Sequence, residues 1–116
     1  MRQEEFRKYC LSKNGVTEEF PFDETTRVFK VKGKIFAITG SEYPLKVNLK
    51  CDPERAAELR ERYEDIVPGY HMNKMHWNTV NFEGSLSDKE LKIMIDHSYE
   101  LVVKGLSRKL KDEMSK

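Results

Sequence analysis

The sequence predicts an α+β domain, an antiparallel sheet with helices packed on one of its faces. Strand-like segments follow one another through residues 26–50, and helical patterns stand before, between and after the strands, in the order α-β-β-β-α-β-α. Because strands and helices do not alternate regularly, a parallel doubly wound sheet is disfavoured. The chain has 116 residues, no internal repeat and no flexible linker, so residues 1–116 are expected to form a single domain.

The composition indicates a globular chain with a heavily charged exterior. Hydrophobic residues make up 38% and charged residues 35%, and no apolar run approaches the roughly 20 residues that span a bilayer. The first residues are charged where a signal peptide needs an apolar core, so a cytoplasmic protein without membrane contact is expected. Cys10 and Cys51 lack zinc-type spacing and are expected to be reduced thiols.

The first helix is predicted over residues 2–14, where apolar residues recur at steps of three and four and Asn14-Gly15 provides a stop signal. An acidic connector over residues 16–24 comes next. Its two aromatic residues, Phe20 and Phe22, are expected to pin it to the core.

A β-hairpin is predicted over residues 26–39. Its β-branched and aromatic residues flank Lys32-Gly33, where glycine supplies the positive φ that a tight turn requires. Residues 45–50 then alternate apolar and polar side chains, which is the pattern of a strand with one face in water.

The second half of the chain is predicted to hold a helix, a strand and a long helix. Asp52-Pro53 is a favourable helix start, and Pro68-Gly69 is a turn signal beyond the end of that helix. A strand follows over about residues 75–82. Ser87 opens a capping box, and the helix after it is expected to fray near Lys111.

The densest polar stretch runs from Tyr70 to Val80 (YHMNKMHWNTV) and holds two of the three histidines and the only tryptophan. In a strand, the side chains of His76, Asn78, Val80 and Phe82 would share one face and those of Trp77, Thr79 and Asn81 the other. The apolar Val80 and Phe82 favour burial of the first set, which leaves Trp77 partly accessible beside Lys74. The opposite assignment remains open if helices cover Trp77.

Neither a metal site nor a catalytic site is predicted. His71 and His76 are five residues apart with no nearby carboxylate or cysteine, so a metal ion would need ligands from elsewhere. The chain has no glycine-rich phosphate loop and no recognisable nucleophile spacing, and Ser98 falls on the apolar stripe of its helix as a small core residue. A protein without enzymatic activity, cofactor or metal is therefore expected.

Positive charge is concentrated in the middle of the chain, although the net charge is only +1. Residues 27–50 hold six basic residues and one acid, a net charge of +5, whereas residues 51–69 carry −3 and residues 102–116 carry +3. Basic side chains on a protruding hairpin can contact phosphates, and the alternative is that they only keep an exposed hairpin soluble.

Several of these segments resemble the MmcQ/YjbR family. They are the run from Tyr70 to Val80, the Val67-Pro68-Gly69 before it, the Ser98-Tyr-Glu-Leu-Val102 of the last helix and the hairpin from Phe29 to Phe36. The resemblance covers nearly the whole chain and implies a CyaY-like, frataxin-like fold with a DNA-binding role on a double-wing surface. Frataxins are thought to hold iron on an acidic first helix, but here the first helix has only Glu4 and Glu5, interleaved with basic residues.

These observations predict a small monomeric DNA-binding protein that contacts the phosphates of double-stranded DNA with little sequence selectivity. The residues expected to make the contacts are Arg27, Lys30, Lys32, Lys34, Lys74, His76 and Trp77. The rival class is a protein-interaction module that uses the histidine- and tryptophan-rich stretch. A small-molecule pocket bounded by His71, Asn73 and His76 is the third alternative.

Overall fold

The computed structural model describes residues 1–69 and 72–115. Within them the chain forms a six-stranded antiparallel sheet, in the order β1-β2-β3-β4-β6-β5, with helices packed against it. The elements are α1 (Gln3–Leu11), β1 (Val16–Glu19), β2 (Arg27–Val31), β3 (Lys34–Thr39), β4 (Lys46–Lys50), α2 (Pro53–Arg62), β5 (Ile66–Pro68), β6 (Trp77–Asn81), α3 (Asp88–Lys104) and α4 (Arg108–Met114).

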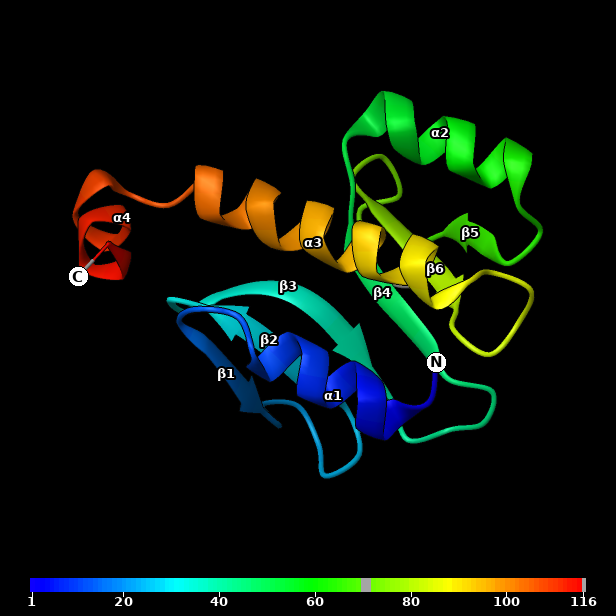
Figure 1. Ribbon diagram of the computed structural model, residues 1–116, viewed down its shortest axis with the longest axis horizontal. Coiled ribbons are helices and arrows are strands. Elements are labelled where there is room, and N and C mark those ends of the chain that lie inside the picture. Colours follow the sequence, from blue (N-terminus) through cyan, green and yellow to red (C-terminus); the bar gives the residue numbers. More distant parts are fainter. Residues whose placement is uncertain (70–71, 116) are drawn as a thin grey trace.

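Helices α1, α2 and α3 pack against the sheet, and α1 and α3 cross over its strands, whereas α4 lies beyond the end of α3 (Figure 1). Strand alternation turns the side chains of Val47, Leu49 and Val80 into the core beneath these helices, where all three are almost fully buried. The alternate residues of the same strands point to the opposite face, which no described helix covers. We call this uncovered surface the open face of the sheet.

Two groups of strands meet in the middle of the sheet, between β3 and β4. Only three residue pairs, from Ala37 with Leu49 to Thr39 with Val47, join these strands. Where this backbone pairing ends, Ser98 of α3 connects the two strands. Its hydroxyl donates to the carbonyl of Phe36 on β3 (2.6 Å) and accepts from the N–H of Lys50 on β4 (2.9 Å). The predicted small core residue thus also bridges two strands through its buried hydroxyl.

The α+β class and the predicted order of elements are confirmed. Three short elements were missed: β1 lies in the expected connector, β5 follows the second helix, and α4 is separate from α3. β1 and β5 are edge strands of three or four residues, too short for a clear alternation, and Pro68 is tolerated at such an edge. Ser107 starts α4 by accepting a hydrogen bond from the N–H of Leu110.

The prediction that Phe20 and Phe22 pin the connector to the core is wrong. Their residues are 45% and 68% exposed. The connector is held instead by β1, which pairs with β2 from Val16 opposite Val31 to Glu19 opposite Val28. Backbone pairing therefore does the work that was assigned to the aromatic side chains.

Candidate nucleic-acid interface

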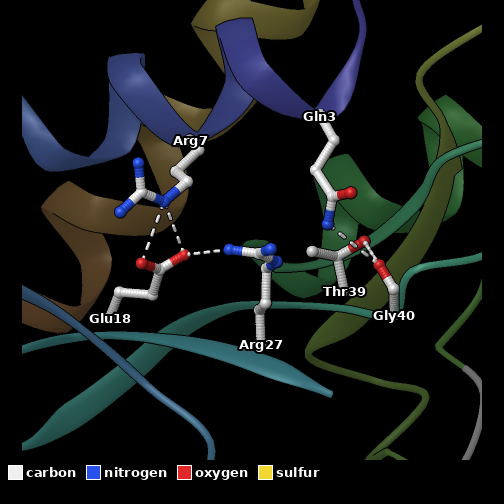
Figure 2. Close-up of polar contacts among 6 residues, drawn as sticks. All are labelled: Gln3, Arg7, Glu18, Arg27, Thr39 and Gly40. Carbon is white, nitrogen blue, oxygen red and sulfur yellow. Dashed lines mark hydrogen bonds and ion pairs between the residues drawn. The ribbon is translucent and has the colours of Figure 1, made fainter. Parts of the chain in front are cut away.

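Arg27, the first basic residue of the hairpin, is held against the helix-covered side of the sheet. Its guanidinium lies 2.6 Å from the carboxylate of Glu18, and the same carboxylate accepts two 2.9 Å hydrogen bonds from Arg7 of α1. Figure 2 shows the Glu18 carboxylate between the two guanidinium groups. Arg27 is thus committed to an ion-pair cluster that joins α1, β1 and β2.

Two further basic residues of the hairpin also have acidic partners. Lys30 lies 3.2 Å from the carboxylate of Glu19 on β1, and Lys32 lies 3.9 Å from that of Glu113 on α4. The hydrogen bond from Lys30 holds the pKa of Glu19 below its ordinary value. Lys34 is exposed, and no acidic partner approaches it in the described part of the chain.

Trp77 begins β6 with its side chain on the open face. Asn78, Val80 and Phe82 are buried to 2% exposure or less, whereas Trp77 is half-buried. The favoured assignment of the two faces is therefore confirmed. Trp77 is paired in register with Lys50 of β4, so the indole and this lysine side chain are cross-strand neighbours.

The loop before β6 places Lys74 and His76 next to Trp77. Its ends are closed by a 2.8 Å hydrogen bond from the N–H of Gly69 to the carbonyl of Trp77, and the ammonium of Lys74 donates to the carbonyl of Gly69. A Cβ atom at residue 69 would lie 2.8 Å from the Cβ of Trp77, so this close approach requires glycine. His71, named for the small-molecule pocket, lies outside the described residues.

The structure thus brings three of the seven predicted contact residues together and adds polar neighbours from β4. Lys74, His76 and Trp77 lie at one end of β6, while Arg27, Lys30, Lys32 and Lys34 belong to a hairpin on the other side of β4. We define the open-face patch as the outward residues of β4 and β6. They are Lys46, Asn48, Lys50, Trp77, Thr79 and Asn81.

Five residues of this patch were not predicted as contact residues, namely Lys46, Asn48, Lys50, Thr79 and Asn81. The signal was in the sequence, because the alternation over residues 45–50 already turned the two lysines and the asparagine to the wet side. What the sequence does not show is the register that places β4 beside β6. No acidic side chain forms an ion pair with Lys46 or Lys50 among the described residues.

The open face is hollowed around Asn48, Thr79 and Asn81. A depression of about 690 Å³ lies over β4, β5 and β6 and is closed on one side by the loop between β3 and β4. Its lining includes the strongly exposed Tyr43 (85%) and Val67 (48%). It also includes the patch residues Lys46, Asn48 and Asn81. Most of the lining residues are polar or charged, so the hollow presents hydrogen-bonding groups and not an apolar wall.

The cysteines are poorly suited to metal binding or nucleophilic chemistry. Both are free, and burial raises the pKa of Cys10 and of Cys51, so that each thiol stays protonated at neutral pH. Across residues 1–69 and 72–115, no three His, Cys, Asp or Glu side chains gather as a metal site would require. None of the helices described has both the length and the apolar character needed to cross a membrane.

Fold and surface together define a small α+β domain whose antiparallel sheet leaves one face open around a tryptophan. The YjbR family model matches residues 11–101, and the chain belongs to the YjbR family. This confirms the resemblance drawn from the sequence motifs.

Relatives and solved structures support this assignment. The chain is 36% identical over 100 residues to the uncharacterised protein YjbR of Escherichia coli K12, covering 85% of each chain. It is 38% identical over 91 residues to the uncharacterised protein YbdF of Escherichia coli O157:H7, covering 78% of this chain and 75% of the relative. A crystal structure of Deinococcus radiodurans protein DR2400 superposes with a TM-score of 0.90 at 39% identity, covering 97% of this chain and 86% of that one.

Proposed function

We propose that the protein is a non-enzymatic nucleic-acid-binding protein that holds a single-stranded segment on the open-face patch. The observation that carries the proposal is the cross-strand pair of Lys50 and Trp77 on a sheet face that none of the described helices covers. An aromatic ring can stack on an unpaired base, while a neighbouring ammonium group neutralises a phosphate. In a duplex the base faces are stacked on one another and are not available to the indole.

The charges of the patch support this proposal. Lys46 and Lys50 have no acidic partner among the described residues, and the ammonium of Lys74, next to the patch, donates to the backbone carbonyl of Gly69. Contact of these three lysines with phosphates would release condensed counterions from the nucleic acid. For a single strand, three such contacts give a slope of log affinity against log salt concentration of about −2.

Fluorescence anisotropy with a labelled mixed-sequence oligonucleotide of about 12 nucleotides tests the proposal, because this length lies within the usual site size of stacking platforms. We expect saturable binding at about 50 mM salt that weakens with the slope given above. A duplex of the same sequence is expected to bind more weakly. Absence of binding to either oligonucleotide at low salt would overturn the proposal.

Trp77→Ala separates stacking from simple charge attraction. Loss of one stacked base is expected to weaken binding by about 1–3 kcal/mol, or roughly 5- to 150-fold. Phe22→Ala is the matched control, because it removes an exposed aromatic ring from the loop between β1 and β2. Equal effects of the two substitutions would show that Trp77 is not part of the interface.

Lys50→Gln tests the phosphate contact beside the indole. It should reduce the magnitude of the salt slope by about 0.7, the value for one phosphate contact to a single strand. Lys89→Gln removes an equal charge from an exposed residue of α3 and is expected to leave the slope unchanged. An unchanged slope in Lys50→Gln would exclude this lysine from the interface.

A further inference from the structure

Two asparagine side chains of the hollow accept hydrogen bonds on their amide oxygens and have no acceptor on their amide nitrogens among the described residues. The Oδ1 atom of Asn81 accepts from the backbone N–H of Glu83 at 2.9 Å, and that of Asn48 accepts from the hydroxyl of Thr79. A backbone N–H can only donate, so the first bond fixes which end of the Asn81 amide points outward. Within the described residues, no hydrogen bond runs from the Nδ2 atom of Asn48 or Asn81 to an acceptor, so both amide N–H groups are available as donors.

These amides lie together with an ammonium group. In the register of β4 and β6, Lys46 is opposite Asn81 and Asn48 is opposite Thr79. The two pairs are two residues apart on each strand, which is a distance of about 7 Å along the strands. All four side chains line the same hollow. The floor of the hollow therefore presents hydrogen-bond donors from the amides and the lysine.

Acceptors in the hollow come from its rim. Glu42 and Glu64 are exposed carboxylates of the lining, whereas the Asp65 carboxylate is bound to the N–H and hydroxyl of Ser85 at 2.8 and 2.9 Å. A ligand that fits this arrangement offers acceptors to the floor and one N–H donor to the rim.

We propose that the hollow is a base-recognition site that prefers thymine and uracil to cytosine, a proposal that rests on the proposed nucleic-acid binding. Thymine and uracil present carbonyl oxygens on both sides of a ring N–H group. Cytosine carries an amino group where thymine has its O4 acceptor, and this donor would face the donors of Asn48, Lys46 and Asn81. Trp77 stacks on any base, so it supplies affinity and the hollow supplies the preference.

The test compares oligo-dT, oligo-dU and oligo-dC of equal length at pH 7.5 and one salt concentration. The number of phosphates and the pyrimidine ring are the same in all three. A difference in affinity therefore reports the hydrogen-bonding groups at the edge of the base. We expect oligo-dT and oligo-dU to bind about 5- to 30-fold more tightly than oligo-dC, the effect of one or two hydrogen bonds gained or lost. Equal affinity for all three, or an oligo-dU affinity as low as that of oligo-dC, would overturn the preference while leaving nucleic-acid binding intact.

Asn81→Asp tests the hollow itself, because it replaces the amide nitrogen with an oxygen and keeps the acceptor for the N–H of Glu83. The ratio of oligo-dT to oligo-dC affinity is expected to fall at least fivefold. Asn73→Asp is the matched control: Asn73 is exposed, its Oδ1 accepts from the N–H of Met75 at 2.9 Å, and it lies in the loop beside Trp77. A ratio that survives in both Asn81→Asp and Asn48→Asp would exclude the hollow, and failure of every oligonucleotide to bind would overturn both proposals.

Discussion

The hairpin of β2 and β3 and the strand β4 both carry basic side chains, but they present them differently. On the hairpin, Arg27, Lys30 and Lys32 each lie within 4 Å of a carboxylate. On β4, Lys46 and Lys50 have no such partner among the described residues and lie beside uncharged neighbours on β6. Positive charge counted along a sequence therefore differs from positive charge available to a ligand.

The edge strand β1 accounts for most of the difference, and α4 pairs with Lys32 through Glu113. By pairing with β2, it places Glu18 opposite Phe29 and Glu19 opposite Val28, within reach of Arg27 and Lys30. β4 lies inside the sheet, between β3 and β6, and its outward neighbours Trp77, Thr79 and Asn81 carry no charge. An acidic segment that the sequence suggests as a connector thus forms a strand and neutralises part of the hairpin.

The largest expected effect on stability comes from removing the Phe6 ring, which packs against both β2 of the hairpin and the segment after β6. The Phe6 ring of α1 meets Phe29 of β2 and Phe82 after β6, each edge to face at 5.3 Å, and Phe6 is completely buried. Phe6→Ala should lower the free energy of unfolding by about 3–5 kcal/mol, measured by urea denaturation. Phe6→Leu is the milder comparison, and equal stability of Phe6→Ala and the native protein would contradict this packing.

A smaller effect is expected at the seam between β3 and β4. Ser98→Ala removes the hydroxyl that satisfies the Phe36 carbonyl and the Lys50 N–H, and it leaves both buried groups without that partner. The expected loss is about 1–3 kcal/mol in the free energy of unfolding. Ser12→Ala, which removes an exposed hydroxyl at the end of α1, is the matched control. Faster amide exchange at Lys50 would locate the effect at the seam.

Much of the fold was predictable because the core strands and helices carry strong local patterns. Alternation over residues 45–50 and the capping signals of Asp52 and Ser87 correctly gave β4, α2 and α3. β1 and β5 were not predictable in this way, because strands of three or four residues at a sheet edge are stabilised mainly by their pairing partners. Pairing between strands that are distant in the sequence leaves no pattern in the residues of either strand alone.

The candidate interface was predictable in part for the same reason. The sequence showed that Trp77 and Lys74 occupy one polar stretch, and it gave the face on which Trp77 lies. It could not show that Lys50, 27 positions earlier, is paired with Trp77, nor that Glu18 and Glu19 neutralise part of the hairpin. Each of these depends on which strands are neighbours in the sheet.

Neutralising two lysines on β4 and, separately, two on the hairpin of β2 and β3 compares the contributions of the two regions to binding. Lys46→Gln with Lys50→Gln should weaken oligonucleotide binding and reduce the magnitude of the salt slope by about 1.4, two phosphate contacts to a single strand. Lys30→Gln with Lys32→Gln should change the affinity less than about twofold, because each already has a carboxylate partner. Anisotropy titrations at several salt concentrations measure the affinity and the salt slope of both double variants. A larger effect of the Lys30 and Lys32 substitutions would place the interface on the hairpin.

The smallest effect concerns the ion pair between Lys30 of the hairpin and Glu19 of β1. The hydrogen bond from Lys30 lowers the pKa of Glu19 in the folded protein, so the pair contributes stability above the unfolded-state pKa of about 4.5 and loses it as pH falls through the lower folded value. An NMR titration of the Glu19 carboxyl should therefore show a pKa below 4.5, and Lys30→Gln should raise it toward that value. Thr17→Val serves as the comparison, since the Thr17 hydroxyl also donates to this carboxylate and is the second cause of the lowered pKa. A Glu19 pKa unchanged by Lys30→Gln would mean that Lys30 is free in solution, and the hairpin would then present as much available charge as β4.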